Sequence, residues 1–195
     1  MITARYAIPS ASPGLMLREE KAAGTPLGIE ADKLTSRGQL VPDANVNQLV
    51  ERWLEKRDSQ FVFDGYPRSR GQADALEQML ARRGTPLDVV LSFEADLKTL
   101  QSRVTNRVVC SSCRRNFSIG LHVVSSEEAC PVCGASLVRR ADDNLETLAL
   151  RMREYAEKTE PLTAYYTERG LLRGVDSTRA PEKVFASVVA ILEGA

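Results

Sequence analysis

Net charge is the first thing this sequence lacks, because 26 basic residues balance 26 acidic residues over a length of 195. A chain with this balance does not bind nucleic acid or anionic membranes through bulk charge. It also lacks an apolar run near the ~18–20 residues that a membrane-spanning helix needs. Residues 1–11 lack the charged start and apolar run of a signal peptide. We therefore expect a cytoplasmic protein with neither nucleic acid nor a membrane as partner.

Internal repeats and low-complexity tracts are missing too, and lysine is scarce, with six lysines beside 20 arginines. This ratio has two interpretations. It can follow from genomic base composition, or from repeated binding of phosphate oxygens, which planar guanidinium groups bind in pairs. Composition does not separate the two, so the positions of the arginines have to.

Strand and helix patterns alternate along the chain. Short apolar runs that end at turn residues predict strands at 60–63, 89–93 and 171–175. Helical periodicity and capping residues predict helices at 12–24, 25–38, 44–55 and 72–83, from 97, from 145, and at 161–170 and 181–192. This alternation predicts an α/β fold with a parallel sheet.

All four cysteines fall in one insertion, as two C-x2-C pairs separated by sixteen residues: Cys110, Cys113, Cys130 and Cys133. Two such pairs can present four thiolates in the tetrahedron that zinc accepts. Disulfides and free thiols are the alternatives, and the lack of a secretory signal disfavours disulfides. With four protein ligands the metal would be structural and would fold an insertion too small for its own core. Phe117 and Leu121 are candidates for its apolar filling, and His122 is expected at the surface.

Charged residues follow the first expected strand. The sequence Asp-Gly-Tyr-Pro-Arg occupies 64–68, and ligands of α/β sheets gather beyond the carboxyl ends of strands. A carboxylate there can hold magnesium through water, and an arginine can hold phosphate. Taken alone, the same five residues could form an ordinary turn.

More charged residues flank the cysteines. Arg103 and Arg107 precede them, four residues apart on an expected helix face, where a solvated surface pair is the alternative. Asp142 and Asp143 follow them, and could simply be first-turn residues of the next helix. Arginines therefore stand on both sides of the cysteine insertion. If a metal makes this insertion a flap, its closure would carry these arginines onto a ligand.

Together these motifs resemble the adenylate kinase family. Residues 64–68 match its signature, with Tyr66 in place of the commoner phenylalanine. The match continues, in family order and spacing, through Tyr6-Ala7-Ile8-Pro9, Met16-Leu17-Arg18, 38–43, Gln72, Arg103-x3-Arg107, the four cysteines, 140–143, Arg151 and Pro161-Leu162. The resemblance spans nearly everything from residue 6 to residue 192.

The resemblance implies a P-loop-kinase-like fold in three parts. These are a core at 1–107 with an AMP-binding region at about 10–41, a zinc lid at 108–138, and the rest of the core at 139–195. It implies reversible phosphoryl transfer, ATP + AMP to two ADP, by a monomer with structural zinc and with magnesium accompanying ATP. In such transfers, positioning and charge neutralisation supply most of the catalysis.

The resemblance also assigns roles to residues of this chain. Catalysis would involve Asp64, Arg68, Arg107, Arg140 and Arg151. AMP would be bound by Arg18, Gln39, Leu40, Val41, Gly65, Tyr66, Pro67, Arg68, Gln72, Arg140 and Arg151. ATP would be bound by Arg103, Arg107, Asn116, Phe117 and Arg179.

The sequence departs from the family at its start. The family opens with a strand and a Gly-x-x-Gly-x-Gly-Lys-Gly loop whose amides and lysine surround the donor phosphates. Only five residues precede the match at Tyr6, and no Gly-Lys dipeptide occurs in the sequence. Pro13 and Leu15 also replace the usual Thr and Asp, which weakens the expected AMP site. We therefore expect unpaired backbone groups on both sides of the place where the first, central strand would lie, so that the two sides either collapse together or leave the chain poorly stable. We also expect little kinase activity from the chain as written.

Two further functions stay open. One is a noncatalytic AMP-binding remnant of the family, since the missing loop fits either a shortened form of a complete kinase or a natural loss. The other is a zinc-ribbon module for nucleic acid, which Arg107, Arg114 and Arg115 near the cysteines would support. Zero net charge and the lack of interleaved aromatic residues disfavour it.

Overall fold

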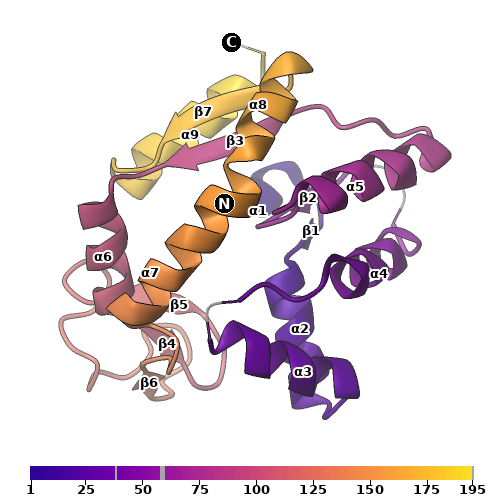
Figure 1. Cartoon of the computed structure of the whole chain (residues 1–195). Helices are drawn as coiled ribbons and strands as arrows, with labels where there is room; N and C mark the ends of the chain where they lie inside the picture. The colour runs from indigo at the N-terminus through magenta and orange to yellow at the C-terminus, as the bar shows by residue number, and fades with distance from the viewer. Residues whose placement is uncertain (38, 58–59, 195) are drawn as a thin grey trace.

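The computed structural model describes residues 1–37, 39–57 and 60–194. Its first part is a set of helices beside a short parallel sheet (Figure 1). Capping residues begin these helices: Thr25 accepts a hydrogen bond from the Gly28 amide, and Pro26 is the first helical residue. The elements are α1 (Ile2–Tyr6), β1 (Ser10–Ala11), α2 (Pro13–Ala22), α3 (Pro26–Thr35), α4 (Asp43–Leu54), β2 (Val62–Phe63) and α5 (Arg70–Arg83).

A second parallel pair joins segments far apart in sequence. Strand β3 (Val90–Glu94) pairs with β7 (Leu172–Asp176) along its whole length. Helix α9 (Pro181–Leu192) packs on β7, and α8 (Pro161–Glu168) contacts both β7 and α5. The buried side chains of Leu162, Tyr165 and Tyr166 hold α8 in place.

The cysteine insertion is an antiparallel sheet that extends from the end of α6 (Leu97–Asn106). Strand β4 (Arg107–Cys110) is central, between β5 (Asn116–Ser118) and β6 (Leu137–Val138). A separate apolar cluster fills this small sheet, built on Val108, Val123 and Leu137 with the two buried cysteines. We call residues 108–138 the lid.

A long helical run leads from the lid back to the β3–β7 sheet (Figure 1). It consists of α7 (Leu145–Glu154), a π-helical turn η1 (Tyr155–Thr159) and α8. Turns of π-helix inside longer helices are frequent at functional sites. Here Thr159 Oγ1 donates to the carbonyl oxygen of Arg68 over 2.7 Å, which fixes η1 against the segment that follows β2.

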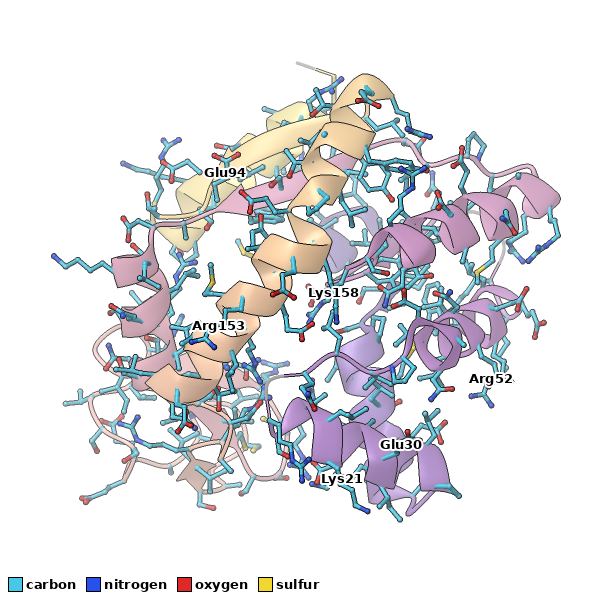
Figure 2. The ribbon with its side chains drawn as sticks, viewed as in Figure 1. Lys21, Glu30, Arg52, Glu94, Arg153 and Lys158 are labelled. Carbon is cyan, nitrogen blue, oxygen red and sulfur yellow. The ribbon has the colours of Figure 1, made fainter. Side chains whose placement is uncertain are left out.

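The main core lies among α2 to α5. Val50, Leu54 and Leu76 are almost wholly buried there, and the partly buried rings of Trp53, Phe61 and Phe63 pack against them. Charged side chains lie on the outer faces, such as Lys21 of α2 and Arg52 of α4 (Figure 2). This division buries the apolar helix faces and leaves the first part of the chain well packed.

The two parallel pairs do not join. Among the described residues, β2 and β3 belong to separate sheets and no strand lies between them. Parallel strands are normally covered on both faces, yet Phe93 of β3 is 53% exposed, and Leu97 just after it is 55% exposed. The two sides of the expected sheet have therefore not joined into one sheet among the described residues, so the first alternative, their collapse together, is not seen.

Most expected elements are present within a few residues of their predicted bounds. The parallel pairs with flanking helices confirm the predicted α/β fold. The expected end of one helix at residue 38 lies outside the described residues, and α3 ends at Thr35. Arg107 corrects a prediction: it does not lie on a helix face with Arg103 but begins β4, because the chain pairs with β5 from that residue on. No described helix is both long and apolar enough to cross a membrane.

Candidate functional site

The segment 64–68 turns sharply after β2. The Asp64 amide makes the last hydrogen bond to β1, to the carbonyl oxygen of Ala11 at 2.8 Å. Gly65 then adopts a φ of +72°, and Arg68 Nε donates to the Gly65 carbonyl oxygen at 2.9 Å. A Cβ atom at residue 65 would lie 2.6 Å from Arg68 Nη2, so only glycine permits this folding of the arginine onto the turn.

A buried polar network lies behind this turn. The Gln72 side chain accepts from the Arg68 amide at 2.8 Å and donates to Asp43 Oδ1 at 2.8 Å. Asp43 Oδ2 accepts from Ser69 Oγ at 2.5 Å. Since a backbone N–H and a carboxylate fix opposite ends of the amide, Gln72 has one defined orientation. Asp43, at the first turn of α4, was not singled out from the sequence, where it reads as an ordinary helix-start residue.

Tyr66 belongs to the same network. Its hydroxyl donates to Asn47 Oδ1 at 2.8 Å and lies 3.3 Å from the carbonyl oxygen of Gln72, and its ring is buried. Burial, followed by the negative charge of Asp43, raises the pKa of Tyr66 well above its ordinary value. Tyr66 therefore stays neutral and connects α4 with α5.

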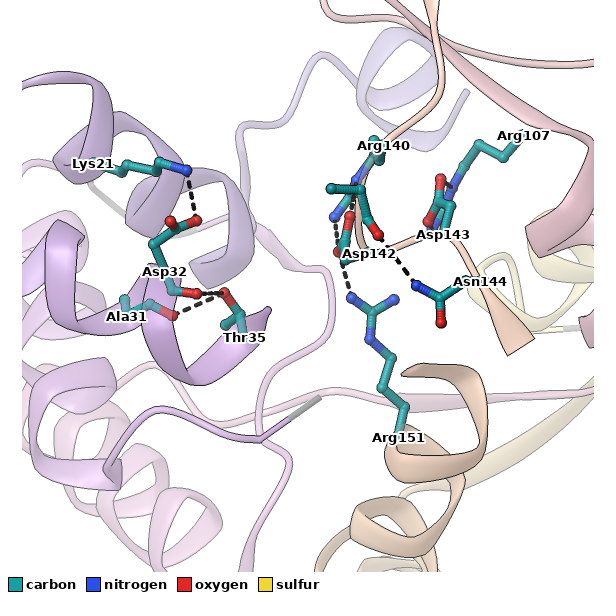
Figure 3. Close-up of polar contacts among 11 residues, drawn as sticks. Lys21, Ala31, Asp32, Thr35, Arg107, Arg140, Asp142, Asp143, Asn144 and Arg151 are labelled. Atoms are coloured by element: carbon teal, nitrogen blue, oxygen red, sulfur yellow. Dashed lines mark hydrogen bonds and ion pairs between the residues drawn. The ribbon is translucent and has the colours of Figure 1, made fainter. Parts of the chain in front are cut away.

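Two carboxylates bind three arginines at the hinges of the lid (Figure 3). Arg107 makes a two-pronged ion pair with Asp143, whose side chain is 1% exposed. Arg140 and Arg151 both donate to Asp142 Oδ2, each at 2.5 Å. These aspartates lie before α7, whose N-cap is Asn144, so the alternative of first-turn helix residues is wrong.

The arginines of this region share one electrostatic environment. Loss of hydration lowers the pKa of Arg18, and Arg140 is the next cause, with Arg107 contributing in the same direction. Loss of hydration also lowers the pKa of Arg68, while the charge of Asp64 raises it and that of Arg151 lowers it. We call Arg18, Arg68, Arg107, Arg140 and Arg151 the arginine cluster. Like charges gathered in this way favour an anionic ligand between them.

The remaining residues predicted to bind a ligand come from several other parts of the chain. Arg103 donates to the carbonyl oxygen of Ser177 just after β7, and Arg179 is exposed two residues further on. Asn116 and Phe117 lie on β5 of the lid. At residues 39–41, the Gln39 amide donates to the Leu34 carbonyl oxygen at 3.1 Å, and the Val41 side chain is buried.

The four cysteines form a compact group. All their Sγ atoms lie within 4.8 Å of one another. The Cys110–Cys133 and Cys113–Cys130 separations are 3.4 Å and 3.7 Å, close to the ~3.8 Å between sulfurs of a tetrahedron with 2.3 Å zinc–sulfur bonds. The Cys113 amide also donates to Cys110 Sγ at 3.3 Å. Burial would raise the pKa of Cys110, but hydrogen bonds from the Cys113 amide and from Cys133 lower it, whereas the neighbouring thiols raise the pKa of Cys113.

Of the two residues predicted to fill the interior of the lid, one is confirmed by the structure and the other is corrected. Phe117 packs with the cysteine cluster, but Leu121 is 65% exposed because it lies at a turn beyond the end of β5. His122 is exposed as predicted, and its Nδ1 accepts from the Ser118 amide at 3.0 Å, which closes that turn.

Comparison with known proteins gives consistent matches over almost the whole chain. The family model described as adenylate kinase matches residues 1–171. A protein named adenylate kinase from Thermodesulfovibrio yellowstonii is 40% identical over 191 residues, which cover 97% of this chain and 89% of that protein. Adenylate kinases from Pseudothermotoga lettingae and a Geobacillus species are 40% and 37% identical, over 96% and 99% of this chain and 88% and 90% of those proteins.

Proposed function

The chain belongs to the adenylate kinase family, and we propose that its arginine cluster binds the phosphate groups of AMP and ATP for reversible phosphoryl transfer. The observation that supports this most directly is the pair of guanidinium groups, Arg140 and Arg151, that converge on one oxygen of Asp142. A phosphate oxygen has the charge and hydrogen-bonding capacity to take the place of that carboxylate oxygen.

On this proposal each side of the cluster has its own ligand. Arg18 and Arg68 would hold the AMP phosphate, and the fixed amide of Gln72 would contact its base. Arg107, supported by Arg103, would approach the ATP phosphates as residues 108–138 close over them. Further contacts would come from the rest of the predicted set: Gln39, Leu40, Val41, Gly65, Tyr66, Pro67, Asn116, Phe117 and Arg179. Closure would exclude water, so that the phosphoryl group passes to AMP rather than to water.

Two metal ions belong to the proposal. Zinc would be held by the four cysteines, where four thiolates with matching separations leave no open position, so its role would be structural. Magnesium, when bound with ATP, neutralises charge on the phosphates. Asp64, exposed directly after β2, would help to position it.

We further propose that the chain as written binds AMP but transfers phosphate poorly. The 195 residues contain no Gly-Lys dipeptide and so no loop of the kind that surrounds donor phosphates. Loss of even one preorganised donor can reduce a rate by ~10²–10³, and a whole loop supplies several. The arginines proposed to hold the AMP phosphate, Arg18 and Arg68, are by contrast both present, although Pro13 and Leu15 replace residues that would support them.

Calorimetry with AMP, combined with an assay of ADP formation, tests both statements. We expect saturable AMP binding with little turnover, and Arg68→Ala should weaken binding at least about tenfold by removing a charged hydrogen-bond donor. Arg173→Ala is the matched control, because Arg173 is exposed and bonds only to nearby carbonyl oxygens. No AMP heat at millimolar ligand, or equal weakening by both variants, would contradict the proposal.

A further inference from the structure

A pocket on the far side of α5 is unrelated to the arginine cluster. It has a volume of about 340 Å³ and lies between the second half of α5, the 84–87 loop, α8 and the start of β7. Its walls are mostly apolar: Leu76, Leu80 and Tyr166 are buried behind them, and Pro86, Leu87 and Leu171 are accessible at the surface of the pocket. Pockets of ~300–1,000 Å³ with apolar walls and a few polar groups are the usual size for small-molecule sites.

This pocket has few polar groups, and they differ in whether they already have a partner of opposite charge or a hydrogen-bond donor. The Tyr165 hydroxyl donates to Glu77 Oε2 at 2.7 Å, so this carboxylate already has a donor. The Arg169 guanidinium lies over the Tyr165 ring at 3.6 Å from its centre, and its Nη1 bonds to the Tyr165 carbonyl oxygen. Across the described part of the chain, no carboxylate lies within ion-pair distance of Arg169. A cation without an acidic partner therefore stands beside an apolar pocket.

A second observation concerns Thr85, in the pocket wall. Its Oγ1 is buried and has no hydrogen-bond partner among the described residues. Buried hydroxyls are normally satisfied, because an unmade hydrogen bond costs about 1–3 kcal/mol. Thr85 is therefore an unsatisfied polar group in a residue that lines the pocket.

From these features we propose that the pocket binds a small aromatic carboxylate. The aromatic part would lie against Pro86, Leu87 and Leu171, the partly or fully exposed apolar residues of the lining, and the carboxylate would pair with Arg169 at the mouth. A cationic ligand fits less well, because the acid present, Glu77, already accepts from Tyr165 and shares the region with Arg169. None of these residues belongs to the arginine cluster, so this site does not depend on the proposed kinase function.

The test uses 2-naphthoate as probe and 2-naphthalenemethanol as its uncharged analogue, in phosphate buffer so that phosphate competes for the arginine cluster. Methyl resonances of Leu76, Leu80 and Leu87 should shift saturably with millimolar 2-naphthoate. Arg169→Gln should weaken the carboxylate about tenfold, as expected for the loss of a charged pair, and leave the alcohol unchanged.

A variant that fills the pocket, compared with a matched control variant, tests whether the probes bind at this site. Ala81 lines the pocket on an exposed position of α5, so Ala81→Phe should abolish binding of both probes without unfolding the chain. Ala164, exposed on α8 and not part of the lining, provides Ala164→Phe, which should bind like the original chain. The proposal is overturned by unchanged affinity in Ala81→Phe, by shifts centred on Leu148 beside the arginine cluster, or by no binding at millimolar probe.

Discussion

Asp142 and Asp143 hold the hinge arginines close together through ion pairs. Without these carboxylates, Arg107, Arg140 and Arg151 would repel one another. Asp142 contacts two of them through one oxygen. Under the proposed function, a phosphate would therefore need to displace only this one carboxylate to gain two guanidinium groups. Asp143 is nearly inaccessible and keeps Arg107 aligned with the start of β4, so we assign it a structural role.

Asp142→Asn should lower the free energy of unfolding at neutral pH by about 1–3 kcal/mol, the range for hydrogen bonds to charged groups. Burial alone would raise the pKa of Asp142, but Arg140 and then Arg151 outweigh it and lower the pKa. A carboxylate with a lowered pKa stabilises the fold above its unfolded-state pKa of about 3.9, and this contribution is lost as pH falls through the folded-state pKa.

Urea unfolding from neutral pH down to about pH 3 checks this prediction. The difference between the original chain and Asp142→Asn should be constant at neutral pH and shrink below the unfolded-state pKa. Asp32→Asn is the control, because Asp32 pairs with Lys21 at an exposed position and should contribute less than about 1 kcal/mol. Equal losses in both variants at every pH would contradict a special role for Asp142.

At the residue scale, features that depend on short spacings along the sequence were predicted well. The two C-x2-C pairs predicted four sulfurs that do lie together. Asp43 was missed because its partners, Ser69 and Gln72, are 26 and 29 residues away, and no local pattern marks that contact. The contact of Thr159 was missed for the same reason, because its partner Arg68 lies 91 residues away in the sequence.

Among the elements, α2 and α3 form the closest helix pair, and Gly28 permits it. A Cβ atom at residue 28 would lie 2.1 Å from the Lys21 amide nitrogen and 2.2 Å from the Glu20 carbonyl carbon. Backbone atoms cannot move aside as a flexible side chain can, so Gly28→Ala should force the helices apart and destabilise the chain by about 3 kcal/mol or more.

Thermal unfolding of Gly28→Ala beside Gly14→Ala separates the contact from helix propensity. A Cβ atom at residue 14 would have its nearest neighbour at 3.6 Å, an ordinary contact. Gly14→Ala should therefore be neutral or stabilise α2 by about 0.5–1 kcal/mol. If both variants unfolded at the same temperature, the close approach of α2 and α3 would not be the cause.

If the four cysteines bind zinc as proposed, the fold of the lid should depend on that metal. Its apolar cluster is small, and zinc binding worth on the order of 10 kcal/mol can fold such a unit. Chelation, or Cys130→Ser, should make residues 108–138 sensitive to proteolysis while the core among α2 to α5 stays resistant. Ser112→Ala, an exposed change between two of the cysteines, is the control. A purified chain with no bound zinc and a protease-resistant lid would contradict the prediction.

Elements with a clear local signal were predicted, and short elements without one were not. Gly84 and Gly170 ended helices where expected, since both adopt positive φ. Strand β1 escaped prediction because Ser10 and Ala11 have no strand pattern and are held only by β2. The strands of the lid and the turn η1 likewise depend on tertiary contacts, through the cysteine cluster and through Arg68.

At the scale of the whole molecule, two half-sheets face an unfilled position. The amides of Val62 and Asp64 donate to the β1 side, to Pro9 and Ala11. Phe63, which lies between them, therefore directs its backbone groups to the opposite edge. The Val90 amide donates to the Leu171 carbonyl oxygen beside β7. The next residue of β3, Leu91, therefore directs its backbone groups away from β7. Within the described ranges neither of these edges pairs with another strand, and Phe93 is exposed, as expected of a sheet without its central strand.

Supplying that strand is the strongest test of this organisation. We expect that the opening strand and glycine-rich loop of the family, fused in place of residues 1–5, will insert between β2 and β3. The strand should slow amide hydrogen exchange at Phe63 and Leu91, because their free groups gain partners. The loop should raise ADP formation by at least ~10²–10³, since it supplies the missing donors to the transferring phosphate.

A second fusion that carries the strand without the loop separates the two effects. It should protect the same amides and stabilise the chain, yet leave ADP formation at its low level, because sheet pairing alone adds no phosphate ligand. Protection without turnover in this fusion, and both in the complete one, would show that the arginine cluster is competent and limited only by the donor side. If neither fusion changed exchange at Phe63, the position between β2 and β3 would not be the place where the strand belongs.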